Sequence, residues 1–416
     1  MQKRLQRFIA FCFTIILASS LTLQPAAAKK LEDWLEGYAS GIDWFGEDFA
    51  YDITDTAACW ELLQRPITIL NVGEREKIFL LDAPNGKKVN TDKRGGYIAG
   101  TTSAVHVLGK DEGGWTLIEG IDEYDRIISG YVRTRLLKTV KPNPNYGLIV
   151  DKLTQRLYVF IDGQFFSSCA ISTGLPNDED AFDETASGEY LISSWVGTFE
   201  NEGLICEKAI RFNDGDLFHQ VPYMLLGDGT QRFSTFESKL GEKASHGCIR
   251  VPRYPNEEGL SIHWLWDNLK KNTKVVIWDD DGRYYPYPED STSLFYNPSG
   301  GSRYHSSSTC QGVRQRYHPL AHFTYDELDT DAYKKLGPCD FCSPVKRHAW
   351  IDAFNQARGY APEPKVTPTP VPTNAPTPTR NPDDIIEIII APPSEDGSAG
   401  EVIGEADSPV SILIVD

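Results

Sequence analysis

The sequence predicts a mainly β, multidomain protein with a small N-terminal β-barrel, a larger β-rich domain with few helices, a small Cys/His module and a disordered tail. Its 416 residues are enough for more than one domain. Two long regions consist of short segments that alternate apolar and polar residues, as half-buried strands do. Only one segment of clear helical periodicity interrupts them. A mainly β fold follows from these patterns.

The N-terminus has the features of a secretory signal peptide. Three cations, Lys3, Arg4 and Arg7, precede the apolar run "FIAFCFTIILASSLTL" and the small residues Ala26–Ala28. A retained membrane anchor is the alternative, but the run is shorter than the roughly 20 apolar residues that a span needs. We therefore expect residues 1–28 to be removed, and the mature protein to be secreted and extracellular or associated with the cell wall.

The charge of the chain limits its partners. The formal net charge is −18, and removal of the three cations of the signal peptide leaves −21. Such an acidic protein is a poor ligand for nucleic acid and for anionic membranes. The apolar stretches "IIEIII" and "SILIV" near the C-terminus are too short to cross a bilayer. We expect no nucleic-acid partner and no membrane span after signal cleavage.

Residues 63–142 are expected to form the small barrel. Short strand-like segments such as "KIFLLD", "SAVHVLG" and "GGWTLIEG" are separated by turn signals, including Pro84-Asn85-Gly86. About five strands in so short a region favour a barrel. The segments "GWTLI" and "GYVRTRLL" resemble the bacterial Src-homology-3-like module, which would bind wall glycan or peptide; a spacer without a ligand is the alternative. We assign His106 to this barrel without a catalytic part.

Residues 145–280 are expected to form the larger β-rich domain. The segments "YGLIVD", "QRLYVFIDG", "QFFSSCAISTG", "SGEYLISS" and "KVVIW" alternate in the manner of half-buried strands. The segment "LSIHWLWDNLKK" has apolar residues at helical spacing and predicts an amphipathic helix. We expect His263, within that helix, to be a packing residue.

The remaining chain is divided by composition. A Tyr/Pro-rich linker, "RYYPYPEDSTSLFYNPSGG", leads to a Cys/His module at residues 302–359. Residues 360–416 begin with a Pro/Thr-rich spacer and end in an acidic segment with Gly, Ser and Pro. Such composition is typical of an extended linker followed by a disordered tail.

Cys248 has the surroundings of a reactive thiol. Of eight cysteines, Cys12 leaves with the signal peptide, and the odd number that remains requires at least one unpaired thiol. In "KASHGCIRVP" a histidine and a glycine directly precede Cys248, and "DLFHQVPY" supplies a second histidine upstream. Imidazoles and backbone N–H groups can favour a thiolate and stabilise an oxyanion. A buried apolar cysteine, or a disulfide with Cys169 or Cys206, is the alternative.

These residues resemble the signature of the YkuD-type L,D-transpeptidases. The likeness covers the block "SHGCIR", the upstream "FHQVPY", the segment "ISTG" and the ending "WLWDNLKKNTKVVIW". It implies that Cys248 is the nucleophile and His219 its base, with the backbone carbonyl of Gln220 orienting the imidazole. His246 would hold the site together.

The same resemblance assigns the supporting residues. The backbone N–H groups of Gly247 and Cys248 would form the oxyanion hole, Ser245 would be a structural support, and Arg250 a cation that faces the substrate or orders the site. Two loops depart from the family pattern. The family's "TPxG" appears as "TASG", without the proline, and the segment between His219 and the "SHGC" block is long. We interpret both as changes in substrate approach.

The resemblance also implies a reaction. The Cys248 thiolate would attack a peptidoglycan tetrapeptide stem, release the terminal D-alanine and form a thioester, which an acceptor amine converts into a cross-link during cell-wall biogenesis. No cofactor is needed for catalysis. If water resolves the thioester, the protein is an L,D-carboxypeptidase; a non-catalytic wall-binding protein is the third alternative.

Four residues of the C-terminal module could bind a metal. His305, Cys310, Cys339 and Cys342 match the ligand number and chemistry of a closed tetrahedral zinc site, which would be structural. The segment resembles the small metal-binding module of the DNA alkylation-repair methyltransferase, without implying a DNA role. A Cys-x-x-Cys disulfide in an oxidising exterior is the alternative.

Overall fold

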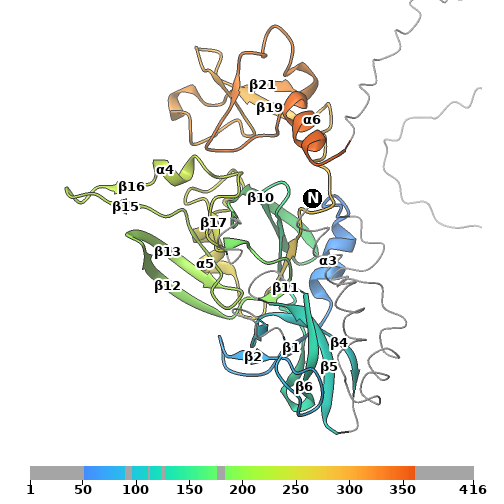
Figure 1. Cartoon of the computed structure of the whole chain (residues 1–416). Helices are drawn as coiled ribbons and strands as arrows, with labels where there is room; N and C mark the ends of the chain where they lie inside the picture. Colours follow the sequence, from blue (N-terminus) through green and yellow to red (C-terminus); the bar gives the residue numbers. More distant parts are fainter. Residues whose placement is uncertain (1–50, 90–95, 111–112, 123–126, 176–182, 361–416) are drawn as a thin grey trace, which may run out of the picture. The chain divides into compact units, whose positions relative to one another are not determined.

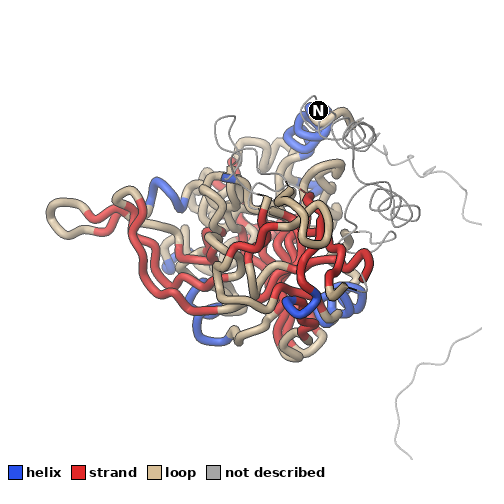
Figure 2. The backbone as a smooth tube through the Cα atoms, turned by 60° about the horizontal axis from the view of Figure 1, so that its bottom comes forward, coloured by secondary structure: helices blue, strands red, loops and turns tan. Residues whose placement is uncertain are grey.

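The computed structural model describes residues 51–89, 96–110, 113–122, 127–175 and 183–360 (Figure 1). The signal peptide and the tail predicted at the two ends lie outside the described residues. Strands dominate the described chain and helices are few, which confirms the mainly β prediction (Figure 2). Within this part of the chain no helix is both long and apolar enough to span a membrane.

The first strands form an antiparallel β-domain, as the sequence predicts. One sheet has the strand order β6-β5-β4-β1-β7, and β2 pairs with β3. The strands are β1 Ile67–Leu70, β2 Lys77–Phe79, β3 Tyr97–Ala99, β4 Ala104–Lys110, β5 Trp115–Ile121, β6 Ile127–Arg133 and β7 Leu137–Val140, with the 3₁₀ turn η1 Thr134–Leu136 before the last. His106 lies on β4, with Nδ1 3.8 Å from Glu119 Oε1 on β5. Its assignment to this domain is confirmed; the likeness to a Src-homology-3-like module stays a prediction.

The second domain packs two sheets around one core. The first sheet has the order β10-β9-β8-β18-β11 and the second β12-β13-β14-β17. Their strands are β8 Tyr146–Asp151, β9 Arg156–Ile161, β10 Gln164–Ala170, β11 Gly188–Leu191, β12 Ser194–Asn201, β13 Leu204–Arg211, β14 Leu217–Gln220, β17 Ile249–Val251 and β18 Lys274–Trp278. The five strands of the first sheet were predicted, but β12 and β13 were not.

The long segment between β14 and β17 contains extra structure. A two-stranded hairpin, β15 (Met224–Leu225) with β16 (Gln231–Arg232), is followed by the short helix α4 (Ser234–Glu237). The hairpin extends away from the sheets in both views (Figures 1 and 2). The extra residues therefore leave the pairing of β14 with β17 undisturbed.

Helix α5 (Ile262–Asn268) confirms the predicted amphipathic helix. Ser261 caps it by accepting a hydrogen bond from the Trp264 N–H, and Ile262 and Leu265 are buried. The prediction for His263 is wrong, because its side chain is exposed on the solvent side of the helix.

Helix α3 (Thr56–Gln64) precedes the N-terminal β-domain in sequence but packs on the second domain. The buried Lys274 ammonium of β18 donates to the carbonyls of Leu62 (2.7 Å) and Arg65 (3.0 Å) at the end of this helix. The same ammonium lies 2.6 Å from the Glu189 carboxylate. The pair neutralises both buried charges and fixes α3 to the sheet.

The C-terminal module has a four-stranded sheet of order β21-β19-β20-β22 and its own small core. Its elements are β19 Ser293–Tyr296, β20 Arg303–His305, η3 Gln315–Tyr317, β21 Ala321–Thr324, η4 Tyr325–Glu327, β22 Gly337–Pro338 and α6 His348–Ala357. Strand β19 lies in the predicted linker, so the expected start at residue 302 is too late. Leu294 packs into one hydrophobic cluster of the module and Phe295 against another. The aromatic residues of the predicted linker thus belong to a strand that contacts both clusters.

Candidate active site

Cys248 lies directly before β17, at the end of a tight turn. Gly247 has φ 102°, a backbone conformation that a residue with a Cβ rarely adopts. Ser245 is buried; its hydroxyl donates to the Cys248 carbonyl, and its N–H donates to the Thr173 carbonyl at 3.0 Å. The sequence predicted that Ser245 and Gly247 support the cysteine. In the structure Gly247 permits the tight turn, and Ser245 hydrogen-bonds the Cys248 backbone.

His219 lies on β14, which runs parallel to β17. Its Nδ1 is 2.6 Å from the backbone oxygen of Gln220, so Nδ1 carries the proton and donates, and Nε2 is left as the acceptor. The ring is buried and meets the Phe199 ring edge to face at 5.6 Å. Burial lowers the pKa of His219 to about 4. The imidazole is therefore neutral near pH 7 and able to accept a proton.

The Cys248 thiol is also neutral at rest. Burial raises the pKa of Cys248 to about 12, and the neighbouring Asp216 carboxylate adds to the rise. The Leu217 N–H and the Arg250 cation act in the opposite direction, as smaller effects. A thiol and imidazole with these pKa values do not form a stable ion pair, so proton transfer has to accompany attack on a carbonyl.

Arg250 occupies the register position beside His219, in the paired strands β14 and β17. Its guanidinium lies 5.4 Å from the centre of the Phe236 ring, and the side chain is buried. Among the described residues it forms no ion pair with a carboxylate, although both Cys206 and Cys248 are near enough to influence its pKa, which burial lowers. A buried guanidinium without an acidic partner is suited to bind a carboxylate of a substrate.

His246 lies at the surface, unlike the buried His219. Its ring is 67% exposed, and Nδ1 is 3.1 Å from Asp183 Oδ1. The pair forms at the surface of the turn that carries Cys248. His246 thus contacts the segment around Asp183, whereas His219 occupies the interior.

A buried polar network beneath the cysteine was missed by the sequence reasoning. Thr185 Oγ1 donates to the Gly247 carbonyl (2.6 Å) and accepts from the Gly174 N–H (2.8 Å). Lys152 donates to the Thr185 carbonyl at 3.0 Å and lies 2.7 Å from Glu184. The "TASG" segment, interpreted above as a feature of substrate approach, therefore supports the nucleophile turn. Its signal in the sequence was a Ser/Thr-rich segment between predicted strands.

The disulfide alternatives for Cys248 are wrong. Cys59, Cys169, Cys206 and Cys248 are all free thiols in this structure. Burial raises the pKa of Cys59 and Cys169 to about 12 and of Cys206 to about 11. These cysteines behave as small apolar core residues.

Comparison with known proteins agrees with this geometry. Residues 145–277 match the YkuD family, described as the L,D-transpeptidase catalytic domain. Residues 145–277 are thus an L,D-transpeptidase catalytic domain. The chain is 32% identical over 135 residues to YciB of Bacillus subtilis (strain 168), a protein named as an L,D-transpeptidase. The match covers 31% of this chain and 63% of YciB, less than two thirds of that relative.

Two solved L,D-transpeptidases are also similar to this chain. The structure from Stackebrandtia nassauensis is 20% identical, with a TM-score of 0.24, over 33% of this chain and 57% of that one. The structure from Xylanimonas cellulosilytica DSM 15894 is 19% identical, with a TM-score of 0.24, over 33% of this chain and 61% of that one.

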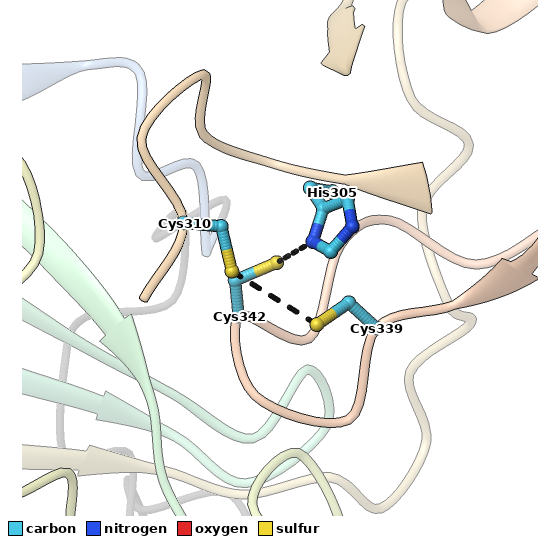
Figure 3. A group of neighbouring side chains, drawn as sticks. All are labelled: His305, Cys310, Cys339 and Cys342. Atoms are coloured by element: carbon cyan, nitrogen blue, oxygen red, sulfur yellow. Dashed lines mark hydrogen bonds between the residues drawn. The ribbon is translucent and has the colours of Figure 1, made fainter. Parts of the chain in front are cut away.

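Outside the L,D-transpeptidase domain, the four predicted metal ligands come together (Figure 3). Their ligand atoms all lie within 4.8 Å of one another. The Sγ atoms of Cys310 and Cys339 are 3.9 Å apart, and Cys342 Sγ is 3.8 Å from His305 Nδ1. Two sulfurs bound at 2.3 Å to a tetrahedral Zn²⁺ would be about 3.8 Å apart. The cysteines are unpaired in this structure, which favours the metal site over the disulfide alternative.

Proposed function

We propose that the protein is a secreted peptidoglycan L,D-transpeptidase that forms cross-links through a thioester at Cys248. The observation that carries the proposal is the neutral, buried His219, whose Nδ1 is held by the Gln220 carbonyl in the strand next to the one that follows Cys248. The match of residues 145–277 to the L,D-transpeptidase catalytic domain supports the same reaction class.

In the proposed acylation, Cys248 Sγ forms a bond to the carbonyl carbon of the third residue of a tetrapeptide stem. The thiol proton moves to His219 Nε2, and the tetrahedral oxyanion accepts hydrogen bonds from the N–H groups of Gly247 and Cys248. The C–N bond to the terminal D-alanine then breaks, and the leaving amine takes the proton from His219. The products are a thioester and free D-alanine, with a neutral imidazole.

In the second half, an acceptor amine attacks the thioester. The attacking amine loses a proton to His219. The C–S bond of the thioester then breaks, and the proton moves from His219 to the Cys248 sulfur. The product is a peptide cross-link, and the enzyme is restored. Arg250 supplies a cation for a stem carboxylate, and His246, paired with Asp183, fixes the exposed side of the nucleophile turn.

The test is intact-protein mass spectrometry of the mature chain incubated with a tetrapeptide muropeptide. We expect a mass gain equal to the tripeptide acyl group in the wild type and in Cys169→Ala, a matched buried-thiol control, but not in Cys248→Ala. Absence of both adduct and D-alanine release from the wild type would favour the wall-binding alternative.

Addition of an amine acceptor separates the two enzymatic alternatives. A transpeptidase converts the adduct into a cross-linked peptide, whereas a carboxypeptidase releases the tripeptide with or without the amine. We favour transfer because residues 145–277 match the L,D-transpeptidase catalytic domain.

We further propose roles for the other domains. Residues 1–28 direct export, residues 63–142 form a Src-homology-3-like module, and the four ligands of the C-terminal module bind a structural Zn²⁺. The ligand geometry supports zinc, and a small module with a limited core gains stability from a metal. Export is tested by N-terminal sequencing of the protein recovered from the culture medium or the wall fraction, which we expect to begin at Lys29.

A further inference from the structure

The turn between β13 and β14, residues 212–216, forms part of the surroundings of the nucleophile. Cys248 Sγ lies 3.8 Å from the Gly215 carbonyl oxygen, and the Leu217 N–H donates to the sulfur. The turn is closed by the N–H groups of Phe212 and Asn213, which both donate to the Asp216 carbonyl at 3.3 Å. Any shift of this turn therefore moves groups that contact the reactive atom.

Residues of the N-terminal domain also contact this turn, through one hydrogen bond and two ion pairs. Ser103 Oγ donates to Asn213 Oδ1 at 2.9 Å. Arg75 Nε lies 3.3 Å from Asp214 Oδ1, and Lys77 Nζ lies 4.0 Å from Asp214 Oδ2. These three residues come from two separate segments of the N-terminal domain. They contact two adjacent residues of the turn, Asn213 and Asp214.

The Asn213 amide links the barrel to the acid beside the sulfur. Its oxygen accepts from Ser103, which directs its NH₂ group toward other acceptors. The Asn213 side chain is hydrogen-bonded to Asp216, and this bond favours the ionised carboxylate. Asp216 in turn opposes formation of the Cys248 thiolate. Each step from Ser103 to the sulfur is a direct contact or a short electrostatic interaction.

Of the barrel contacts, the one from Ser103 is expected to act most strongly. The Ser103 residue is buried, whereas the side chains of Arg75 and Lys77 are 61% and 48% exposed. Exposed ion pairs contribute little and are screened by salt, whereas a part-buried hydrogen bond such as that from Ser103 is less screened and costs more to lose.

We propose that the N-terminal barrel is a positioning element of the L,D-transpeptidase site, acting through Ser103 and Asn213 on the β13–β14 turn that surrounds the Cys248 sulfur. The chemistry affected rests on the function proposed above, but the positioning itself can be measured without it. Ser103 and Asn213 are positioning residues, because neither is placed to contact a substrate's reacting atoms.

The charged groups around the turn set the direction of the effect. Asp214 and Arg211 influence Asp216, and Asp216, Cys206 and Arg250 influence Cys248. Burial, with Asp214, raises the pKa of Asp216 to about 7. Loss of the hydrogen bond from Asn213 would raise the pKa of Asp216 further. A smaller fraction of Asp216 would then be ionised beside the Cys248 sulfur at pH 8. The thiolate of Cys248 should then form more readily.

The experiment compares the mature full-length chain with Ser103→Ala, with Ser129→Ala as a matched control on the exposed side of β6. Alkylation of Cys248 by iodoacetamide is followed by peptide mass mapping between pH 6 and 10, and donor acylation is measured in parallel. In Ser103→Ala we expect alkylation at pH 8 to rise about threefold, as a pKa lowered by roughly half a unit requires. Because a released turn no longer holds the Gly215 and Leu217 backbone groups against the sulfur, we nevertheless expect kcat for acylation to fall about threefold or more, with KM unchanged.

The Asn213→Ala variant tests the route. It should reproduce both changes, and adding Ser103→Ala to it should have no further effect, because the two residues act through one contact. Unchanged alkylation in Ser103→Ala, or full additivity of the two substitutions, would overturn the proposal. If alkylation changes as expected while the wild type forms no acyl adduct, the proposed function fails and the positioning stands.

Discussion

Replacement of Thr185 by valine tests whether the buried network under the nucleophile turn determines both stability and rate. Valine has the shape of threonine without the hydroxyl. Thr185 is fully buried, and so are the Gly247 carbonyl and the Gly174 N–H that its hydroxyl satisfies. Each buried group left without a partner costs about 1–3 kcal/mol. We expect Thr185→Val, which leaves two such groups, to lower the free energy of unfolding by about 2–6 kcal/mol.

The effect on rate follows from the planarity of the peptide bond. The Gly247 carbonyl and the Cys248 N–H belong to one peptide plane, so a carbonyl that turns to find another partner also turns the N–H proposed for the oxyanion hole. Loss of one such donor lowers kcat by about 10²–10³. Because the turn is only partly released in Thr185→Val, we expect a decrease of about tenfold to a hundredfold.

Urea unfolding and single-turnover D-alanine release measure the two effects separately. The control is Thr185→Ser, which retains the hydroxyl and removes only a methyl group. Release is compared at urea concentrations at which every variant is folded. The reasoning is refuted if Thr185→Val unfolds at the same urea concentration as Thr185→Ser, or if the two release D-alanine at equal rates.

Three further predictions concern the histidines and the metal. His219→Ala should reduce acylation by at least about a hundredfold and His246→Ala by less than about tenfold, since only the buried ring is placed as a base; equal losses in stopped-flow acylation would contradict this. Because burial lowers the pKa of His219 to about 4, acylation should stay maximal down to about pH 5 and fall below that as the imidazole is protonated, whereas a midpoint near 6.5 would indicate an exposed base. Elemental analysis should find about one zinc per chain, lost in Cys339→Ser, and a metal-free chain with two fewer free thiols would instead indicate a disulfide.

The sequence indicated the candidate residues of the site more readily than the residues that support them. Cys248, His219 and Gly247 are recognisable because a nucleophile, a base and a tight turn need particular residue types in a short block. The β13–β14 turn and Thr185 could not be found in this way, because Asn, Asp, Gly and Thr are ordinary loop residues. Their importance depends on which carbonyl or sulfur they meet after two sheets have packed together, and no local pattern encodes that.

The strands, too, were predicted where a local pattern was strong and missed where they depend on partners distant in the sequence. Strong alternation predicted the strands of the first catalytic sheet, whereas β12 carries a mixed pattern and is half exposed, so its period was weak. Strand β19 was hidden by the turn residues around it. It is a strand because Leu294 and Phe295 pair with Phe323 and His322 of β21, a strand that lies further along the chain than β20.

The free cysteines bear on the proposed export. In an oxidising exterior, thiols react through their thiolates, so a cysteine persists unpaired when its thiolate is rare. With a pKa of about 12, only about one thiol in 10⁵ is ionised at pH 7. Burial thus protects Cys59 and Cys169, whereas the half-buried Cys248 is protected only by the high pKa of its thiol. A nucleophile activated only by coupled proton transfer to His219 suits this compartment better than a preformed thiolate, because the state that reacts with substrate is absent while the site is empty.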